Sequence, residues 1–234
     1  NMSLDEEMEN KVWQQTELFE LLNNMPVIQF MFPEVEADDV ISAVAQAPIY
    51  DGWQKVIISS DKDFIQLLGS DDVVLYRPIQ KQFLNRLRVV EEYGIHPANF
   101  AMARAMVGDP SDNLPGIRGI GLPSVAKRLS FLQEGKSFTF SDIYEHCENV
   151  EKQLKIHTNI LENKAVIEDN YKLMQLYSPS ISVQSKEKIK YTLENADMGF
   201  NKTGITKIMY EIGFGELNWS DLAATMRRIS LENS

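Results

Sequence analysis

The chain has 234 residues, of which 44% are apolar and 24% charged, so it is long enough for one large or two small globular domains. This composition excludes a disordered, collagen-like or purely repetitive protein. The single cysteine, Cys147, excludes a disulfide framework and a cysteine-based zinc site, and it favours a reducing compartment. No apolar run reaches the roughly 18 residues of a membrane-spanning helix, and the acidic first residues lack the apolar core of a signal peptide. We therefore expect no membrane partner.

The charge is strongly acidic but uneven. The formal net charge is −11, and taken alone it argues against nucleic acid, because phosphate affinity comes from basic side chains. Residues 77–128, however, carry eight basic side chains against four acidic ones. Screening limits electrostatic fields to about 8–10 Å at physiological salt, so a local basic patch can bind phosphate on an acidic protein. Ordinary variation along an acidic chain would also produce such a window.

Helix-like and strand-like patterns alternate over the first 80 residues, which is typical of an α/β unit. Because Ile57 and Ile58 are adjacent in the clearest strand, we expect a parallel sheet with both faces covered. Helical spacing of apolar residues predicts the helices, and short β-branched or apolar runs predict the strands. In chain order, the expected elements are a helix at 5–23, a strand at 26–30, a helix at 36–46, a strand at 55–59, a short helix at 63–68 and a strand at 73–76.

The pattern becomes helical beyond residue 80. Helices are expected at 89–94, 97–107 and 122–132, followed by mostly amphipathic helix from 141 to 234. Pro179 and the stretch Gly213–Gly215 are expected breaks. The predicted organisation is an α/β core at 1–80 and a helical region at 81–234.

Three groups of acidic residues follow predicted elements. Two of them come directly after strands, and in open α/β sheets sites form outside the carboxyl ends of the strands. Crowded carboxylates need a cation, and hard oxygen ligands favour Mg²⁺ or Mn²⁺. Two such ions about 3.5–4 Å apart would hold the attacking and leaving oxygens of a phosphodiester. Acids are also favoured in a first helical turn, and Asp and Asn in turns, without any metal. The groups are Glu34–Asp39, Asp61–Asp63 and Asp109–Asp112.

A glycine-rich turn follows the third acidic group. Gly116, Gly119 and Gly121 allow the backbone to turn with positive φ and to approach another surface closely. A helix with Lys127 and Arg128 follows, and amides at such a turn can bind anions. With helices on both sides, the segment at about 105–132 is interpreted as a helix–hairpin–helix that holds the DNA backbone without contacting bases. A helix linker with glycine caps is the alternative.

Together these motifs resemble the 5′-nuclease family, which includes flap endonucleases, the 5′→3′ exonuclease domain of bacterial DNA polymerase I and related phage nucleases. The order and approximate spacing match over about residues 36–130. The motifs that carry the resemblance are Glu36-Ala37-Asp38-Asp39, Ser59-Ser60-Asp61-Lys62-Asp63-Phe64, Val107-Gly108-Asp109-Pro110-Ser111-Asp112-Asn113-Leu114-Pro115-Gly116 and Gly119-Ile120-Gly121.

The resemblance implies a PIN-like, three-layer α/β fold and a divalent-metal-dependent hydrolase that cuts DNA phosphodiesters at 5′ ends or flaps in replication or repair. It implies a bacterial or phage-infected host cytoplasm and, as further partners, a single-strand binding protein or a clamp. Potassium is implied at the glycine turn. Carried over by position, the catalytic residues are Glu36, Asp38, Asp61, Asp63 and Asp112. The metal residues add Asp39 and a supporting Asp109, with Glu36, Asp38 and Asp39 at one ion and the others at the second. The DNA-binding residues are Gly116, Gly119, Gly121, Ser124, Lys127 and Arg128.

One part of the family pattern is absent before Glu36. The family begins with a central strand that ends in an Asp-Gly turn, and it then has a basic helical arch. We therefore expect that the N-terminal portion is either truncated or supplied by another chain. This leaves a non-catalytic, structure-specific DNA-binding module or one half of a split nuclease as alternative functions. An RNA-directed nuclease and a plain interaction protein are further alternatives, and exonuclease and flap preference are both open.

Overall fold

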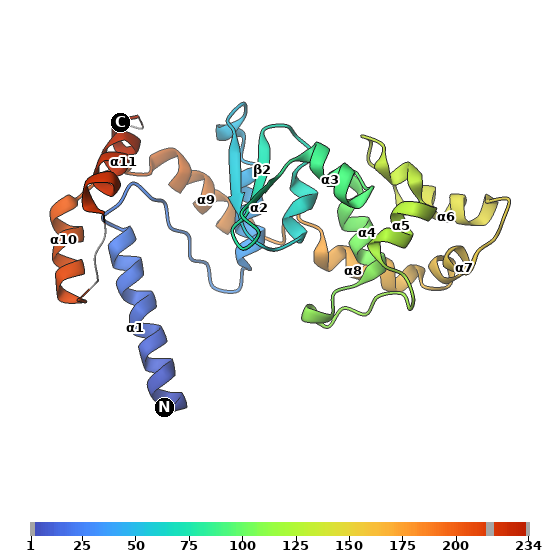
Figure 1. Ribbon diagram of the computed structural model, residues 1–234, viewed down its shortest axis with the longest axis horizontal. Helices are drawn as coiled ribbons and strands as arrows, with labels where there is room; N and C mark the ends of the chain where they lie inside the picture. The colour runs from blue at the N-terminus through green and yellow to red at the C-terminus, as the bar shows by residue number, and fades with distance from the viewer. Residues whose placement is uncertain (1–2, 214–217, 233–234) are drawn as a thin grey trace. The chain divides into compact units, whose positions relative to one another are not determined.

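The computed structural model describes residues 3–213 and 218–232, which form two compact units (Figure 1). The central unit comprises Glu34–Ser182, and the terminal unit comprises the described residues before and after it. The boundary expected near residue 80 falls inside the central unit, between two paired strands. All the predicted site residues belong to the central unit.

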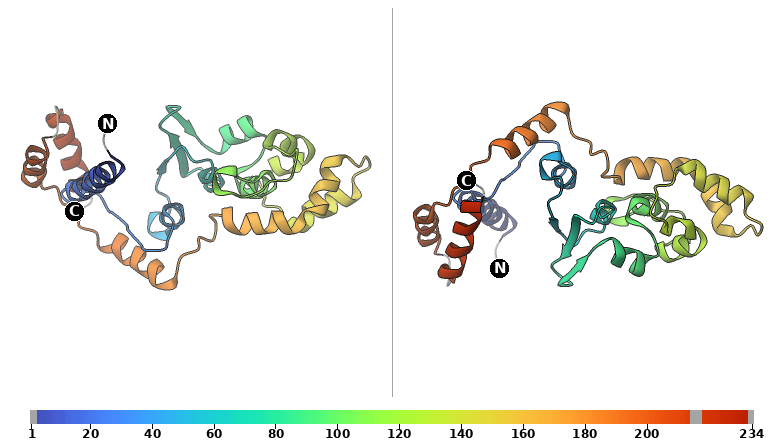
Figure 2. Two further views of the ribbon diagram at one scale, coloured as in Figure 1. Left: turned by 90° about the horizontal axis from the view of Figure 1, so that it is seen from below. Right: turned by 90° about the horizontal axis from the view of Figure 1, so that it is seen from above.

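A three-stranded sheet lies at one end of the central unit (Figures 1 and 2). β1 (Lys55–Ile58) and β2 (Val73–Arg77) are parallel, with Ile57 opposite Leu75. These two strands confirm the predictions at 55–59 and 73–76. β3 (Gln82–Leu84) pairs antiparallel with β2 after a tight turn in which Lys81 has a φ of 51°. The sequence does not predict β3, because three residues are too few for a pattern of alternation.

The strand predicted at 26–30 is wrong. These residues form no regular element. A short apolar run predicts a strand only if a neighbouring strand satisfies its backbone. In the terminal unit the segment is held by a side chain instead, because the Gln29 amide donates to the Phe19 carbonyl at 3.0 Å and to Asn23 Oδ1 at 2.9 Å. The segment is thereby attached to the end of α1 (Leu4–Leu22), which matches the helix expected at 5–23.

The two faces of the sheet differ, contrary to the expectation that both are covered. Ile57 and Leu75 are buried in the main core, whereas Val56 and Ile58 are 47% and 69% exposed. Phe83 of β3 lies on the same exposed face, because it is paired with Tyr76, the partner of Ile58. A continuous apolar strand therefore does not establish which elements cover it.

Helices of the central unit pack around α4 (Phe100–Val107), which is buried on nearly every side. α4 lies beside α8 (Lys164–Met174). The buried Asn170 amide on α8 donates to the carbonyls of Ala105 at 3.0 Å and Pro115 at 2.9 Å, which ties α8 to the end of α4 and to the following loop. The other elements in this part of the central unit are α2 (Ala37–Ala45), η1 (Pro48–Tyr50), η2 (Asp63–Leu67), α3 (Arg86–Tyr93), η3 (Pro97–Asn99) and η4 (Pro110–Asp112).

Helices account for most of the remaining described residues, as predicted. The helix expected at 122–132 divides into α5 (Leu122–Arg128) and η5 (Ser130–Gln133). Of the expected breaks, Pro179 lies in an irregular segment and Gly213 follows the end of α10 with a φ of 64°, while residues 214–217 lie outside the described residues. None of the described helices is long and apolar enough to cross a membrane. The other helices are α6 (Phe140–Asn149), α7 (Lys155–Glu162), α9 (Val183–Asn195), α10 (Lys202–Glu211) and α11 (Trp219–Glu232).

Candidate metal centre

Side chains from the three acidic groups line one cleft of about 640 Å³ in the central unit. Its acidic residues come from the start of α2, the turn after β1 and the loop after α4. The end of α8 and the segment that follows it also line the cleft. The predicted convergence of separate chain segments is therefore observed. The acidic lining residues are Glu34, Glu36, Asp38, Asp39, Asp61, Asp63 and Asp112.

Local hydrogen bonds explain how the first two groups face the cleft. Asp38 Oδ1 accepts from the Asp39 amide at 2.9 Å, and Asp39 Oδ1 accepts from the Ser180 amide at 3.1 Å. In the turn after β1, Asp61 Oδ1 accepts from the Asp63 amide at 2.9 Å and begins η2. These are the ordinary roles of acids at helix starts and turns. These hydrogen bonds do not exclude a role in metal binding, because each carboxylate also lines the cleft.

The third group lies on a closed loop. The backbones of Asp109 and Leu114 exchange hydrogen bonds of 3.0 and 2.8 Å. Gly108, with a φ of 74°, and Gly116 lie against each other, and a Cβ on Gly116 would stand 1.7 Å from the Val107 carbonyl oxygen. The loop thus requires glycine at both positions, and it presents Asp112 at its tip.

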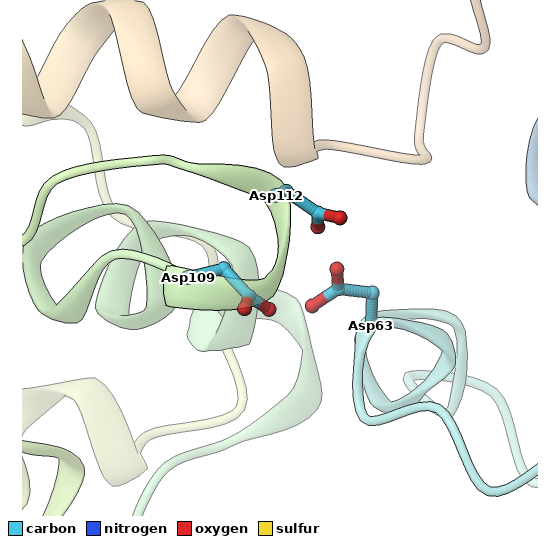
Figure 3. A group of neighbouring side chains, drawn as sticks. All are labelled: Asp63, Asp109 and Asp112. Atoms are coloured by element: carbon cyan, nitrogen blue, oxygen red, sulfur yellow. The ribbon is translucent and has the colours of Figure 1, made fainter.

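Three carboxylates form the tightest group in the cleft region. One oxygen each from Asp63, Asp109 and Asp112 lies within 4.8 Å of the others (Figure 3). Asp63 and Asp109 are partly buried, and Asp112 is exposed. Oxygen atoms at this spacing fit the donor set of a hard divalent cation, and the absence of histidine and cysteine from the group argues against a zinc-type site.

Arg104 on α4 contacts two members of this group, Asp63 and Asp109. Its Nε donates to Asp63 Oδ1 at 3.0 Å, and its second terminal nitrogen donates to Asp109 Oδ2. The Arg104 side chain is 12% exposed, and it lines an adjacent cleft of about 520 Å³ together with Asp61 and Asp112. Arg104 is one of the eight basic residues of the window 77–128, and its sequence position alone predicted no role at the acidic site. The sequence did contain a signal for such a role: Arg104 is the single charged residue of an otherwise apolar helix. If that helix is buried, the charge requires a partner.

The surroundings shift the pKa values of Asp63 and Asp109 in opposite directions. Burial raises the pKa of Asp63, and the negative charges of Asp61 and Asp109 add to this, against the opposing effect of Arg104. Hydrogen bonding from the Ser111 hydroxyl lowers the pKa of Asp109, with Arg104 also lowering it. An additional cation beside Asp63 would relieve the cost of burying its charge.

The glycine turn borders a second cleft, also of about 640 Å³. Of the predicted DNA-binding residues only Gly119 lines it. The Ser124 hydroxyl is engaged with Gly121, accepting from its amide at 3.0 Å and donating to its carbonyl at 2.7 Å, while Lys127 and Arg128 are exposed on α5. The helix–hairpin–helix stays a prediction. The lining residues are Ile117, Arg118, Gly119, Ile120, Lys155, Ile156, Asn159 and Asn163, and those from α7 had no sequence signal because they lie far along the chain.

Comparison with known proteins gives the family. Residues 5–94 match the model of the 5′-3′ exonuclease N-terminal resolvase-like domain. A 5′-3′ exonuclease of Buchnera aphidicola is 30% identical over 202 residues, covering 86% of this chain and 67% of that protein. The chain belongs to the 5′-3′ exonuclease family. The family and enzyme class predicted from the sequence, a hydrolytic 5′ nuclease, are confirmed.

One further relative and one solved structure extend the comparison. The thermostable DNA polymerase I of Thermus thermophilus is 32% identical over 136 residues, which are 58% of this chain but 16% of that protein. A bacteriophage T5 flap endonuclease, solved in a pseudo-enzyme-product complex with DNA and metal ions, has a TM-score of 0.59 and 18% identity over 90% of this chain and 72% of that one. This likeness confirms the predicted PIN-like α/β fold with a helical region. The antiparallel β3 departs from the parallel sheet that the sequence predicted.

Proposed function

We propose that this chain carries the metal site of a 5′→3′ exonuclease or flap endonuclease that hydrolyses DNA phosphodiester bonds. The observation that carries the proposal is the single cleft formed by seven carboxylates from three separate segments. Family membership supports the reaction class. The T5 relative, which was solved with DNA and metal ions, supports DNA as the substrate and divalent ions as cofactors.

Under this proposal the cleft would hold two divalent ions, Mg²⁺ or Mn²⁺. Glu36, Asp38 and Asp39 at the start of α2 would hold one, and Asp61, Asp63 and Asp112 the other, with Asp109 in support. Ions at these positions would supply Lewis-acid chemistry for the attack of water on phosphorus and for departure of the leaving oxygen. The chain's own residues hold the carboxylates at fixed positions, and the end of α8 also lines the cleft.

The glycine turn is proposed to hold duplex DNA beside the cut. Gly116, Gly119, Gly121 and Ser124 would present backbone groups, with potassium among the carbonyls, and Lys127 and Arg128 would contact phosphates. Arg118 and Lys155 at the neighbouring cleft support a phosphate contact there. A clamp or a single-strand binding protein as a further partner is proposed only by analogy with replication enzymes.

The test compares the wild-type chain with Asp112→Asn on a labelled 5′-flap duplex with Mg²⁺. Asp112 is exposed and takes part in no ion pair among the described residues, so the change should spare the fold. Loss of one ligand should weaken metal binding by at least about 10–100-fold and slow cleavage accordingly, while DNA binding is retained. Asp51→Asn, an exposed aspartate that does not line the cleft, is the matched control.

Two outcomes would contradict the proposal. Equal cleavage by the wild type and Asp112→Asn would show that the carboxylate cleft takes no part in catalysis. DNA binding by a wild-type chain that never cleaves, with Mg²⁺ or Mn²⁺ present, would favour the alternative of a non-catalytic binding module or one half of a split nuclease.

A further inference from the structure

Arg104 is a buried cation within the acidic region. It lies on α4 between Ala103 and Ala105, both fully buried, and its guanidinium spans two carboxylates through different nitrogen atoms. Asp63 and Asp109 are themselves only 15% and 16% exposed at their side chains. A planar guanidinium is suited to bridging two acids in fixed geometry, whereas a single ammonium group is not.

The charges around Arg104 do not balance. Asp63, Asp109 and Asp112 with one guanidinium leave two negative charges uncompensated. Asp61 and Lys62, which line the adjacent cleft with Arg104, carry opposite charges and leave this difference unchanged. That remainder matches one divalent ion. Arg104 uses only part of the acids' capacity, because an ionised carboxylate offers about four lone-pair sites. For Asp63, no described residue donates to Oδ2, and that oxygen remains available.

We propose that Arg104 is the built-in counter-cation of this cluster: it keeps Asp63 and Asp109 beside Asp112 when no metal is bound, and it weakens the binding of a divalent ion there. The proposal rests on the proposed metal site. A fixed positive charge within a few ångströms of a divalent ion repels it, while the same charge stabilises the empty cluster. Arg104 therefore lowers the affinity for the metal and, at the same time, holds the carboxylates in place before the metal binds.

The test measures thermal unfolding of the full chain with and without Mn²⁺, together with calorimetric Mn²⁺ titration. Arg104→Met removes the charge and keeps much of the side-chain length. It should lower the Tm of the metal-free protein and enlarge the Tm rise that Mn²⁺ produces, since binding to the folded state stabilises it. The apparent Kd for Mn²⁺ should fall about tenfold. Arg104→Lys keeps the charge, and its Mn²⁺-induced rise should stay near that of the wild type.

Arg77→Met is the matched control. Arg77 is an equally buried arginine of the same unit, 11% exposed at its side chain and 3.9 Å from Glu92, and it does not line the acidic cleft. Its loss should lower the Tm without changing the rise produced by Mn²⁺. A merely structural role for Arg104 would make Arg104→Met behave in the same way.

Each outcome decides the proposal. A larger Mn²⁺ response in Arg104→Met than in the wild type supports it, and so does a variant that folds only when Mn²⁺ is added. An equal or smaller response overturns it while leaving the metal site intact. Failure of both Arg104→Met and Arg104→Gln to fold even with Mn²⁺ also overturns it. A wild type with no Mn²⁺ response overturns the proposed function as well.

Discussion

The acidic cleft and the glycine turn share the loop after α4 but are built in different ways. The cleft gathers side chains from α2, from the turn after β1 and from the loop after α4, so it exists only when the central unit is folded. The turn is one continuous segment whose shape depends on backbone conformation, with a φ of 79° at Gly119 and the close contact of Gly108 with Gly116. Tertiary packing therefore brings the acidic groups together, whereas local sterics fix the backbone path of the glycine turn.

The largest effect is expected from Gly116→Ala. A Cβ there would stand 1.7 Å from the Val107 carbonyl oxygen, and backbone atoms cannot move aside as the end of a side chain can. We expect destabilisation of about 4 kcal/mol or more, measured by urea unfolding. The control is Gly121→Ala, where the backbone is extended and the nearest atom to a Cβ is 3.8 Å away. The control should cost at most about 1 kcal/mol. Equal stability of the two variants would show that the loop is not held by this contact.

A smaller effect is expected from Arg118→Ala. Arg118 is exposed and lines the cleft beside the glycine turn with Lys155. Its loss should weaken duplex DNA binding several-fold and reduce the slope of log affinity against log salt by about 1. The Mn²⁺-induced Tm rise should not change, which would separate the turn from the acidic cleft. Lys152→Ala, an exposed lysine outside that cleft, is the control. Equal losses in both variants would indicate unspecific attraction.

The smallest effect concerns pH and the helices beside the turn. Burial lowers the pKa of His157 below its ordinary value of 6.5, and the nearby His146 and Arg128 lower it further. The unfolded chain therefore binds a proton more readily, so the stability that His157 contributes is present above its unfolded pKa and is lost as pH falls through the folded pKa.

We expect the Tm of the wild type to fall between about pH 7 and about pH 5 and His157→Gln to show a shallower fall. The fall should remain in part, because burial also lowers the pKa of His96. Identical pH profiles of the wild type and the variant would contradict the assignment. The measurement is a series of thermal melts across this pH range.

The predictable parts of the fold were those with a strong local pattern. The β-branched run at 55–59 predicted β1, and the position of Asp61 and Asp63 directly after it predicted their place at the sheet edge. The run at 26–30 was equally apolar but is held by Gln29, and the pairing that decides between strand and irregular segment involves residues distant in sequence.

The missed parts of the site depend on tertiary packing. Arg104 joins the acidic group only because α4 packs against the turn that holds Asp63, 41 residues earlier in the chain. Lys155 and Asn159 reach the cleft at the glycine turn because α7 lies beside α6 and α8. Neither arrangement leaves a spacing pattern that a single sequence could reveal.

The contact between Gly108 and Gly116 has a consequence for the dimensions of the enzyme. It holds residues 108–116 in the closed loop that carries Asp109 and Asp112, and the glycine turn begins where this loop ends. The separation between the proposed metal site and the proposed DNA contact would then depend on this closed loop. Under the proposed function, this loop would set the distance from the DNA contact to the cleaved bond, and the position of cleavage should tolerate changes elsewhere in the helical region.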